Sequence, residues 1–126
     1  MHSTFIRRVL LADALISAAA GLVMIVGAGA LAPLLGLPLE LLQGAGVILM
    51  PWTLLLLWLA RAAAVPRAGV HAVIAVNAAW VLGSIAVLFV FAPSPFGYAF
   101  VIAQALVVGV LTELQLVALK REPAAA

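Results

Sequence analysis

The sequence of 126 residues contains no cysteine and very few charged residues. Six Lys and Arg and four Asp and Glu make up 8% of the chain, whereas a soluble domain has about a quarter of its residues charged. Hydrophobic residues make up 68%. A water-soluble globular fold is therefore excluded, because too few polar side chains are present to cover its surface. The lack of cysteine also excludes a cysteine nucleophile and a CxxCH haem motif.

Motifs of soluble enzymes are missing as well. The sequence has no GxSxG, no HExxH and no glycine-rich phosphate loop. The stretch 27–29 contains two glycines but follows no predicted strand, so it does not indicate a dinucleotide site. We therefore assign no catalytic residue and predict that the chain is not an enzyme. Its six dispersed cations form no continuous basic patch, which argues against a nucleic-acid partner.

Four long apolar stretches are what the sequence has in abundance. They cover residues 9–32, 41–60, 70–92 and 96–119 and are 20 to 24 residues long. A helix rises about 1.5 Å per residue, so each stretch is long enough to cross a hydrocarbon core of roughly 30 Å. The alternation of polar and apolar residues that marks barrel strands is absent. These features predict an all-α integral membrane protein with four spans.

Proline and serine mark the expected starts of three of these helices. Pro38 precedes the second, Pro66 the third, and Ser94 with Pro95 the fourth. The connections between the stretches are short, and short links make neighbouring helices antiparallel. We therefore expect residues 1–126 to form one domain, an up-down four-helix bundle, with a disordered tail at 122–126.

The basic residues indicate the orientation of the predicted bundle. They lie before the first stretch, between the second and third, or after the fourth: Arg7, Arg8, Arg61, Arg67, Lys120 and Arg121. Cytoplasmic loops are enriched in Lys and Arg. Both termini are therefore expected in the cytoplasm. We expect a multi-pass protein of a cell inner membrane, with the lipid bilayer as its partner.

Small residues recur at spacings that allow helices to approach closely. Ser17 and Gly21 are four residues apart, as are Ala79 and Gly83, and Gly44 and Gly46 occur together in the second stretch. Small residues at such spacings let two backbones pack tightly in a membrane. This pattern predicts either packing within the chain or a homodimer, and the sequence leaves both open.

Polar residues near the middle of the spans form a first predicted layer. Asn77 and Gln104 lie at similar depth, and Trp80 and Ser84 follow Asn77 on one face of the third stretch. Two interpretations stay open. These side chains form hydrogen bonds between helices, or they line a cavity that contacts a substrate.

Ionisable residues nearer the cytoplasmic boundary form a second predicted layer, made of Asp13, His71 and Glu113. An ionised carboxylate in hydrocarbon costs roughly 2.5 to 3.5 kcal/mol, so such groups pair, face the interior or take up a proton. Three interpretations compete. The layer is a set of ion pairs with neighbouring Arg and Lys, a proton or cation site centred on Asp13, or a haem or metal site using His71 with His2. We assign no metal ligands and no cofactor.

The chain resembles uncharacterised four-span proteins of bacterial inner membranes. The resemblance rests on three segments, RRVLLADAL in the first stretch, LAPLLGLP after it and GYAFVIAQA in the fourth. In size and number of spans the chain is also similar to small multidrug resistance transporters, which carry a glutamate in their first span. Asp13 is the corresponding residue here, and the later motifs of that family are absent.

Transport or permeation of a small solute, coupled to protons through Asp13, is the function that these features favour. The alternative is a structural or regulatory accessory subunit that binds another membrane protein. A haem or metal protein is a third candidate.

Overall fold

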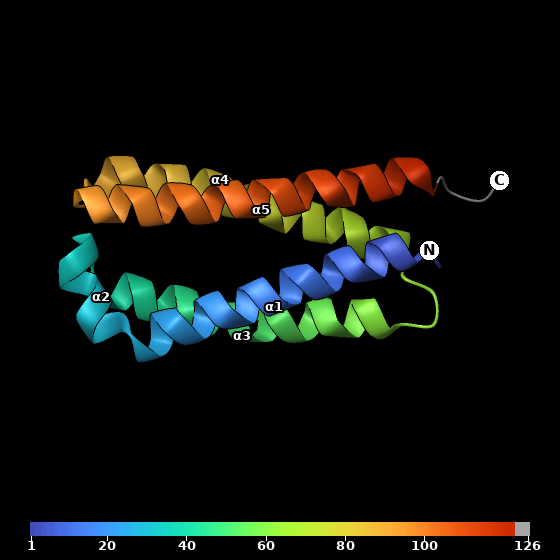
Figure 1. Cartoon of the computed structure of the whole chain (residues 1–126), viewed down its shortest axis with the longest axis horizontal. Helices are drawn as coiled ribbons and strands as arrows, with labels where there is room; N and C mark the ends of the chain where they lie inside the picture. Colours follow the sequence, from blue (N-terminus) through green and yellow to red (C-terminus); the bar gives the residue numbers. More distant parts are fainter. Residues whose placement is uncertain (123–126) are drawn as a thin grey trace.

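The structure, a computed structural model, describes residues 1–122, and these are helical throughout with short connections and no strand. The five helices are α1 (Thr4–Val26), α2 (Ala28–Leu35), α3 (Leu39–Arg61), α4 (Arg67–Phe91) and α5 (Pro95–Arg121) (Figure 1). The predicted all-α class is confirmed. The tail was predicted to be disordered over 122–126. This is wrong for Glu122, which accepts hydrogen bonds from His2 and Ser3, and residues 123–126 lie outside the described residues.

The first apolar stretch differs from its prediction as one helix over 9–32. The helix α1 begins five residues earlier, at Thr4, and ends at Val26, where Gly27 interrupts the helical backbone. The short helix α2 then continues to Leu35 and contains Pro33. Gly36 follows with a φ of 66°, the left-handed conformation that ends a helix most easily when the residue is glycine. The chain therefore turns through α2 before α3 begins.

Serine residues cap two helices. Ser94 is the N-cap of α5, as predicted, and its side chain accepts a hydrogen bond from the Gly97 N–H, while Pro95 occupies the first turn. Ser3 caps α1 in the same way by accepting from the Phe5 N–H. Such caps satisfy N–H groups that have no partner inside the helix.

The long helices pack as two pairs. The helix α1 lies along α3, α4 lies along α5, and α1 also contacts α5 (Figure 1). The closest approach within the first pair involves Gly21 and Gly46, since a Cβ at Gly46 would lie 2.8 Å from the Gly21 carbonyl oxygen. These two glycines serve packing within the chain. In contrast, a Cβ at Gly44 or Gly83 would meet nothing within 4 Å.

Hydrogen bonds tie three segments together at one end of the molecule. The Val65 N–H, in the connection between α3 and α4, donates to the Met1 carbonyl at 2.7 Å. The Glu122 carboxylate accepts from the backbone N–H groups of His2 and Ser3. The start of α1, the connection before α4 and the end of α5 are therefore neighbours.

Two arginines stabilise this end by binding helix C-termini. Arg7 donates to the carbonyl oxygens of Ala60, Ala62 and Ala63 at 2.5 to 2.8 Å, in the last turn of α3 and just after it. Arg67 donates to the carbonyl oxygens of Leu119 and Glu122 at the end of α5. Cationic side chains are favourable there because the last carbonyls of a helix are unpaired and carry partial negative charge.

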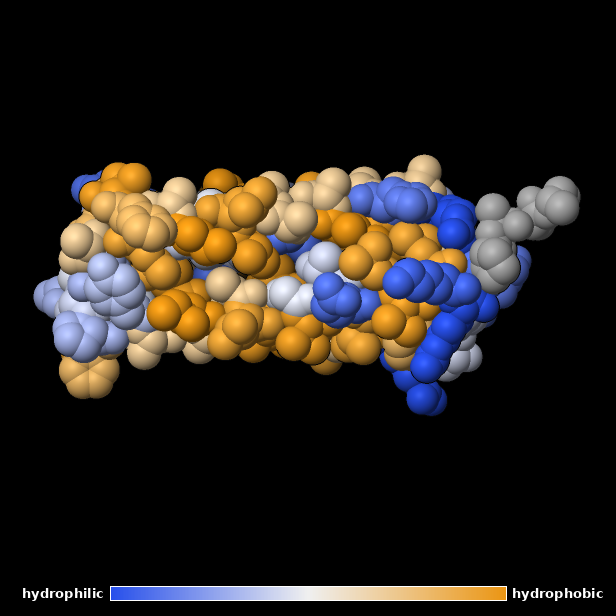
Figure 2. All heavy atoms as spheres, turned by 90° about the horizontal axis from the view of Figure 1, so that it is seen from above, coloured by the Kyte–Doolittle hydropathy of each residue, from blue (hydrophilic) through white to orange (hydrophobic). Residues whose placement is uncertain are grey.

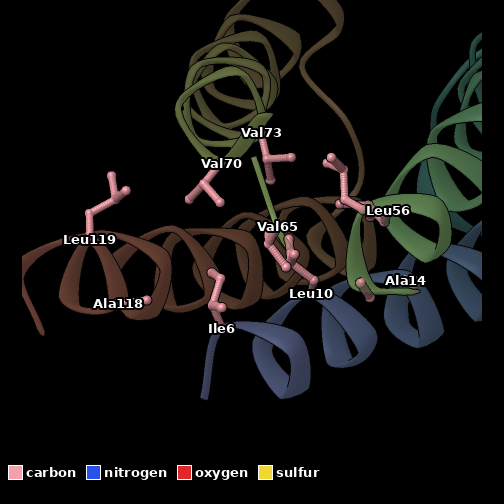
Figure 3. Packing of buried hydrophobic residues seen from close by; sticks show 11 residues of the cluster. Ile6, Leu10, Ala14, Leu56, Val65, Val70, Val73, Ala118 and Leu119 are labelled. Carbon is pink, nitrogen blue, oxygen red and sulfur yellow. The ribbon is translucent and has the colours of Figure 1, made fainter. Parts of the chain in front are cut away.

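Two clusters of buried apolar residues lie towards opposite ends of the molecule. The first combines residues of all four long helices (Figure 3): Ile6, Leu10, Ala14, Leu56, Leu59, Ala60, Val65, Val70, Val73, Ala118 and Leu119. The second lies towards α2: Met24, Ala28, Leu35, Leu37, Leu42, Leu49 and Val101. We call them the tail-end cluster and the α2-end cluster. The middle of each helix therefore lies between two apolar layers.

Most of the apolar surface remains uncovered by the chain itself. The four long helices are long and apolar enough to cross a membrane, and only 11% of the most apolar window of α4 is buried. Figure 2 shows hydrophobic residues along the length of the molecule and strongly hydrophilic ones gathered at one end. These features fit a multi-pass membrane protein, whose outer surface contacts lipid.

Candidate functional site

Asp13 is the centre of a buried polar cluster on three helices. Its side chain, on α1, is 2% exposed. The Asn77 amide on α4 donates to Asp13 Oδ2 at 2.9 Å, and the Gln115 amide on α5 donates to the same oxygen at 2.8 Å. Ser17, one turn further along α1, donates to Oδ1 at 3.3 Å. The carboxylate thus accepts hydrogen bonds on both oxygens.

The cluster is closed by a further bond between its two amides. Asn77 Nδ2 also donates to Gln115 Oε1 at 3.1 Å. Asn77 is 4% exposed and Gln115 is fully buried. Within residues 1–122, every buried side-chain nitrogen or oxygen atom has a partner. Complete hydrogen bonding offsets much of the cost of placing polar groups between apolar layers.

The partners of Asp13 are neutral, and the predicted ion pair with an arginine is not formed. Arg7, which is half-buried on α1, is bound to carbonyl groups at the end of α3. Arg8, Arg61 and Lys120 are exposed at the helix ends. The physical reason is that helix-end carbonyls lie at the depth that these cationic groups reach, whereas Asp13 lies two turns deeper. A carboxylate without a cationic partner is the unusual feature of this molecule.

A small cavity borders this carboxylate. Its volume is about 80 Å³, and all four long helices line it with Asp13, Ser17, Ile48, Leu49, Trp52, Val76, Asn77, Trp80 and Val108. The deep tryptophans Trp52 and Trp80 therefore face the same space as the polar cluster. A cavity of this size holds a few water molecules or one small ion, since a water occupies about 30 Å³ in the liquid.

Gln104 belongs to a separate polar group closer to α2. Its side-chain oxygen accepts from Trp80 Nε1 at 2.7 Å, and its nitrogen donates to Ser84 Oγ at 2.8 Å. Both bonds join α4 to α5. The sequence suggested hydrogen bonding between Asn77 and Gln104. In the structure these two residues have different partners. Of the two interpretations for this layer, hydrogen bonding between helices describes Gln104, Trp80 and Ser84.

His71 and Glu113 lie outside the buried cluster. Both side chains are exposed, so the predicted layer of Asp13, His71 and Glu113 is not assembled. Glu113 lines an open groove of about 560 Å³ between α4 and α5, whose other walls are mainly apolar. Helix geometry accounts for this placement, because His71 is about 120° around α4 from the buried Asn77.

Gln115 is the site residue that sequence reasoning missed. It continues a buried stripe on α5 through Val101, Gln104, Leu111 and Ala118, with spacings of three, seven, four and three residues. Glu113 is two residues away, or about 200° around the helix, and so faces outward. Helical periodicity counted from Gln104 would have selected Gln115 instead of Glu113.

The described residues offer no cluster for a transition metal. No group of three or more His, Cys, Asp or Glu side chains comes together in residues 1–122. His2 and His71 are both exposed, and neither joins the polar cluster. The carboxylate, hydroxyl and amide groups around the cavity are hard oxygen donors, which suit a proton or a small cation.

Comparisons with known proteins give no assignment. Searches against protein-family models, curated proteins and solved structures found no match to this chain.

Proposed function

We propose that this chain is a small multi-pass protein of a bacterial inner membrane that moves a small solute, using Asp13 to bind the coupling proton or cation. In this proposal the four long helices form an up-down bundle with both termini in the cytoplasm. The observation that carries it is a buried carboxylate with only neutral partners, beside a cavity that all four long helices line. A carboxylate inside a membrane that lacks a structural counter-ion is typical of ion pathways.

The distribution of charge supports the orientation. The basic residues lie at the start of α1, the end of α3, the start of α4 and the end of α5, and hydrogen bonds bring these segments together at one end. Glu40, at the start of α3, is the charged residue of the opposite end. Under the positive-inside rule the basic end faces the cytoplasm.

For a transporter, this packing would correspond to a closed conformation. The tail-end cluster separates Asp13 from the cytoplasmic end, and the α2-end cluster separates it from the other. Access therefore requires that helices move apart at one end at a time. The α1–α3 pair and the α4–α5 pair pack mainly within themselves, so their mutual displacement is the motion with the least packing to lose.

Ion flux into proteoliposomes tests the proposal. Proton entry is followed with an internal pH dye, and sodium and potassium entry with radioactive tracers, under an imposed potential. We expect flux above that of empty liposomes, reduced at least about tenfold by Asp13→Asn, because the neutral amide no longer binds a cation or proton. The matched control is Glu113→Gln, which removes an exposed carboxylate of α5 and should leave flux unchanged. Absence of flux, or equal flux in Asp13→Asn, would refute the proposal.

One observation favours the accessory role as a second candidate. The groove between α4 and α5 is open, mainly apolar and has Glu113 on its wall, which is a surface that a helix of another membrane protein could cover. A photo-crosslinking residue at Ala105, in this groove, would then form adducts that the same residue at Val47, exposed on α3, would not. Adducts of twice the chain mass would instead indicate a homodimer.

A further inference from the structure

We infer that the cavity beside Asp13 is a binding site for a monovalent inorganic cation. The inference deepens the proposed function, on which it rests for its biological role, by naming the species that Asp13 binds. Its evidence is the hydrogen-bond pattern of the cluster, the kinds of atom around the cavity, and the balance of charge.

The direction of the hydrogen bonds is that of a carboxylate anion. Two amide N–H groups, from Asn77 and Gln115, are donated to one oxygen of Asp13. An amide nitrogen donates and does not accept, so this oxygen acts as the acceptor of both bonds. Ser17 supplies a third donor to the other oxygen. Three donors therefore surround the Asp13 carboxyl group and no cationic side chain pairs with it, so a bound cation would supply the missing counter-charge between the apolar layers.

Oxygen atoms suited to a cation are present at the cavity. Asn77 uses its nitrogen for both hydrogen bonds, which leaves its carbonyl oxygen available. The Asp13 carboxylate and the Ser17 hydroxyl line the same cavity, and so do the indoles of Trp52 and Trp80. Carboxylate, hydroxyl and amide oxygens replace the hydration shell of a small cation, and indole rings attract cations.

The charge balance indicates a monovalent ion. The cavity has one carboxylate, and no group of three or more His, Cys, Asp or Glu gathers anywhere in the described part of the chain. A divalent ion would leave one positive charge uncompensated in a buried site, at a large electrostatic cost. The volume of about 80 Å³ accommodates a sodium or potassium ion with one or two waters.

Tryptophan fluorescence and thermal unfolding of the purified protein in detergent test this inference. Trp58 is exposed, so Trp58→Phe removes its background and leaves the cavity residues Trp52 and Trp80 as reporters. Sodium, potassium, lithium and ammonium chlorides are titrated at constant ionic strength against N-methylglucamine chloride, whose cation is too large for the cavity. We expect a saturable fluorescence change and a rise in melting temperature with at least one small cation. Binding to the native state stabilises it in proportion to the logarithm of ligand concentration.

Two variants assign the binding to the cavity. Asp13→Asn should weaken cation binding at least about tenfold, since one charged contact is lost. Ser17→Ala keeps the carboxyl group but removes one oxygen, and it should weaken cation binding less. This second variant keeps the test decisive if Asp13→Asn fails to fold. Glu113→Gln, outside the cavity, is the control and should bind as the unaltered protein does.

The outcomes separate this inference from the proposed function. Identical behaviour in all cations and N-methylglucamine, a response to pH alone, or an unchanged response in Asp13→Asn would each overturn cation binding. Cation binding without flux would leave the inference standing and refute transport. Flux of protons alone would support transport and overturn the inference.

Discussion

At the scale of single residues, the molecule is organised around one carboxylate. Asp13 is held by side chains that are 64 and 102 positions distant in sequence, so its environment exists only in the folded chain. In lipid, interhelical hydrogen bonds contribute modestly, on average about 0.6 kcal/mol and up to about 1.7 kcal/mol. The bonds of this cluster are at the upper end, because one partner is charged and all partners are buried.

Replacing Gln115 with leucine should therefore destabilise the protein although it adds apolar surface. The substitution removes one of two donors to Asp13 Oδ2 and leaves the Asn77 amide with one acceptor fewer. We expect a loss of about 1 to 2 kcal/mol in the free energy of unfolding, measured by denaturant titration in mixed micelles. The control is Glu113→Leu, two residues away on the exposed side, which should cost little or stabilise the protein in lipid. Equal effects of the two variants would contradict this account of the cluster.

Several of these residues were predictable and others were not. Asp13, Asn77 and Gln104 stand out because polar residues inside apolar stretches are rare, whatever the fold. Which of them touch depends on the rotation of each helix and on its neighbours. Charge alone marks Glu113 as a candidate, whereas the periodicity of α5 buries the neutral Gln115 and exposes Glu113. An ion pair between Asp13 and an arginine was one of three interpretations. In the structure Arg7 and Arg67 bind helix C-termini instead, and partial charges on backbone carbonyls carry no signal in the sequence.

At the scale of helices, steric fit decides which elements pair. No hydrophobic force draws helices together in lipid, so close backbone approach has to supply the attraction. The helix α1 packs against α3 where Gly21 and Gly46 meet, and the carbonyl oxygen of each lies within 3.2 Å of the position that a Cβ would take on the other. The small-residue pattern correctly predicted that helices approach each other closely. It did not distinguish Gly46 from Gly44, which lies two residues away and faces outward.

Some helix ends were predicted correctly from the sequence and one was missed. Pro38, Pro66 and Ser94 mark three starts correctly, because each is favoured next to the first helical turn and disfavoured within a helix. The break at Gly27 was not predicted. Apolarity continues without interruption from α1 into α2, and hydropathy alone has no means of detecting a change in backbone direction.

The two neighbouring glycines of α3 provide a matched pair of variants. A methyl group at Gly46 would lie 2.8 Å from the backbone oxygen of Gly21, so Gly46→Ala should force α1 and α3 apart. Overpacking of this kind costs about 1 to 3 kcal/mol. Gly44→Ala meets nothing within 4 Å and should be neutral or gain up to about 1 kcal/mol from helix propensity. Unfolding of both variants in the same micelles checks the prediction, and similar stabilities would show that the two helices do not meet at Gly46.

At the scale of the whole molecule, charge and apolar surface are separated along one axis. The apolar flanks are uncovered along the length of the molecule, and most strongly hydrophilic residues lie at one end (Figure 2). The same basic end is closed by hydrogen bonds among the first residues, the α3–α4 connection and the end of α5. The basic residues on which the proposed orientation rests therefore lie at the end that these hydrogen bonds hold together. A label placed at either end of the molecule tests the orientation of the whole bundle.

Cysteine labelling tests that arrangement directly, because the chain contains no cysteine of its own. Ala63→Cys places a thiol in the exposed connection between α3 and α4, and Phe96→Cys places one in the first turn of α5 at the other end. With a membrane-impermeant maleimide added to intact spheroplasts, we expect Phe96→Cys to react and Ala63→Cys to react only after permeabilisation. In the proposed orientation the basic residues would keep the α3–α4 connection in the cytoplasm, since moving them across the bilayer is costly. The positions are one span of α4 apart, so reaction of both from outside, or of Ala63→Cys alone, would contradict the proposed topology.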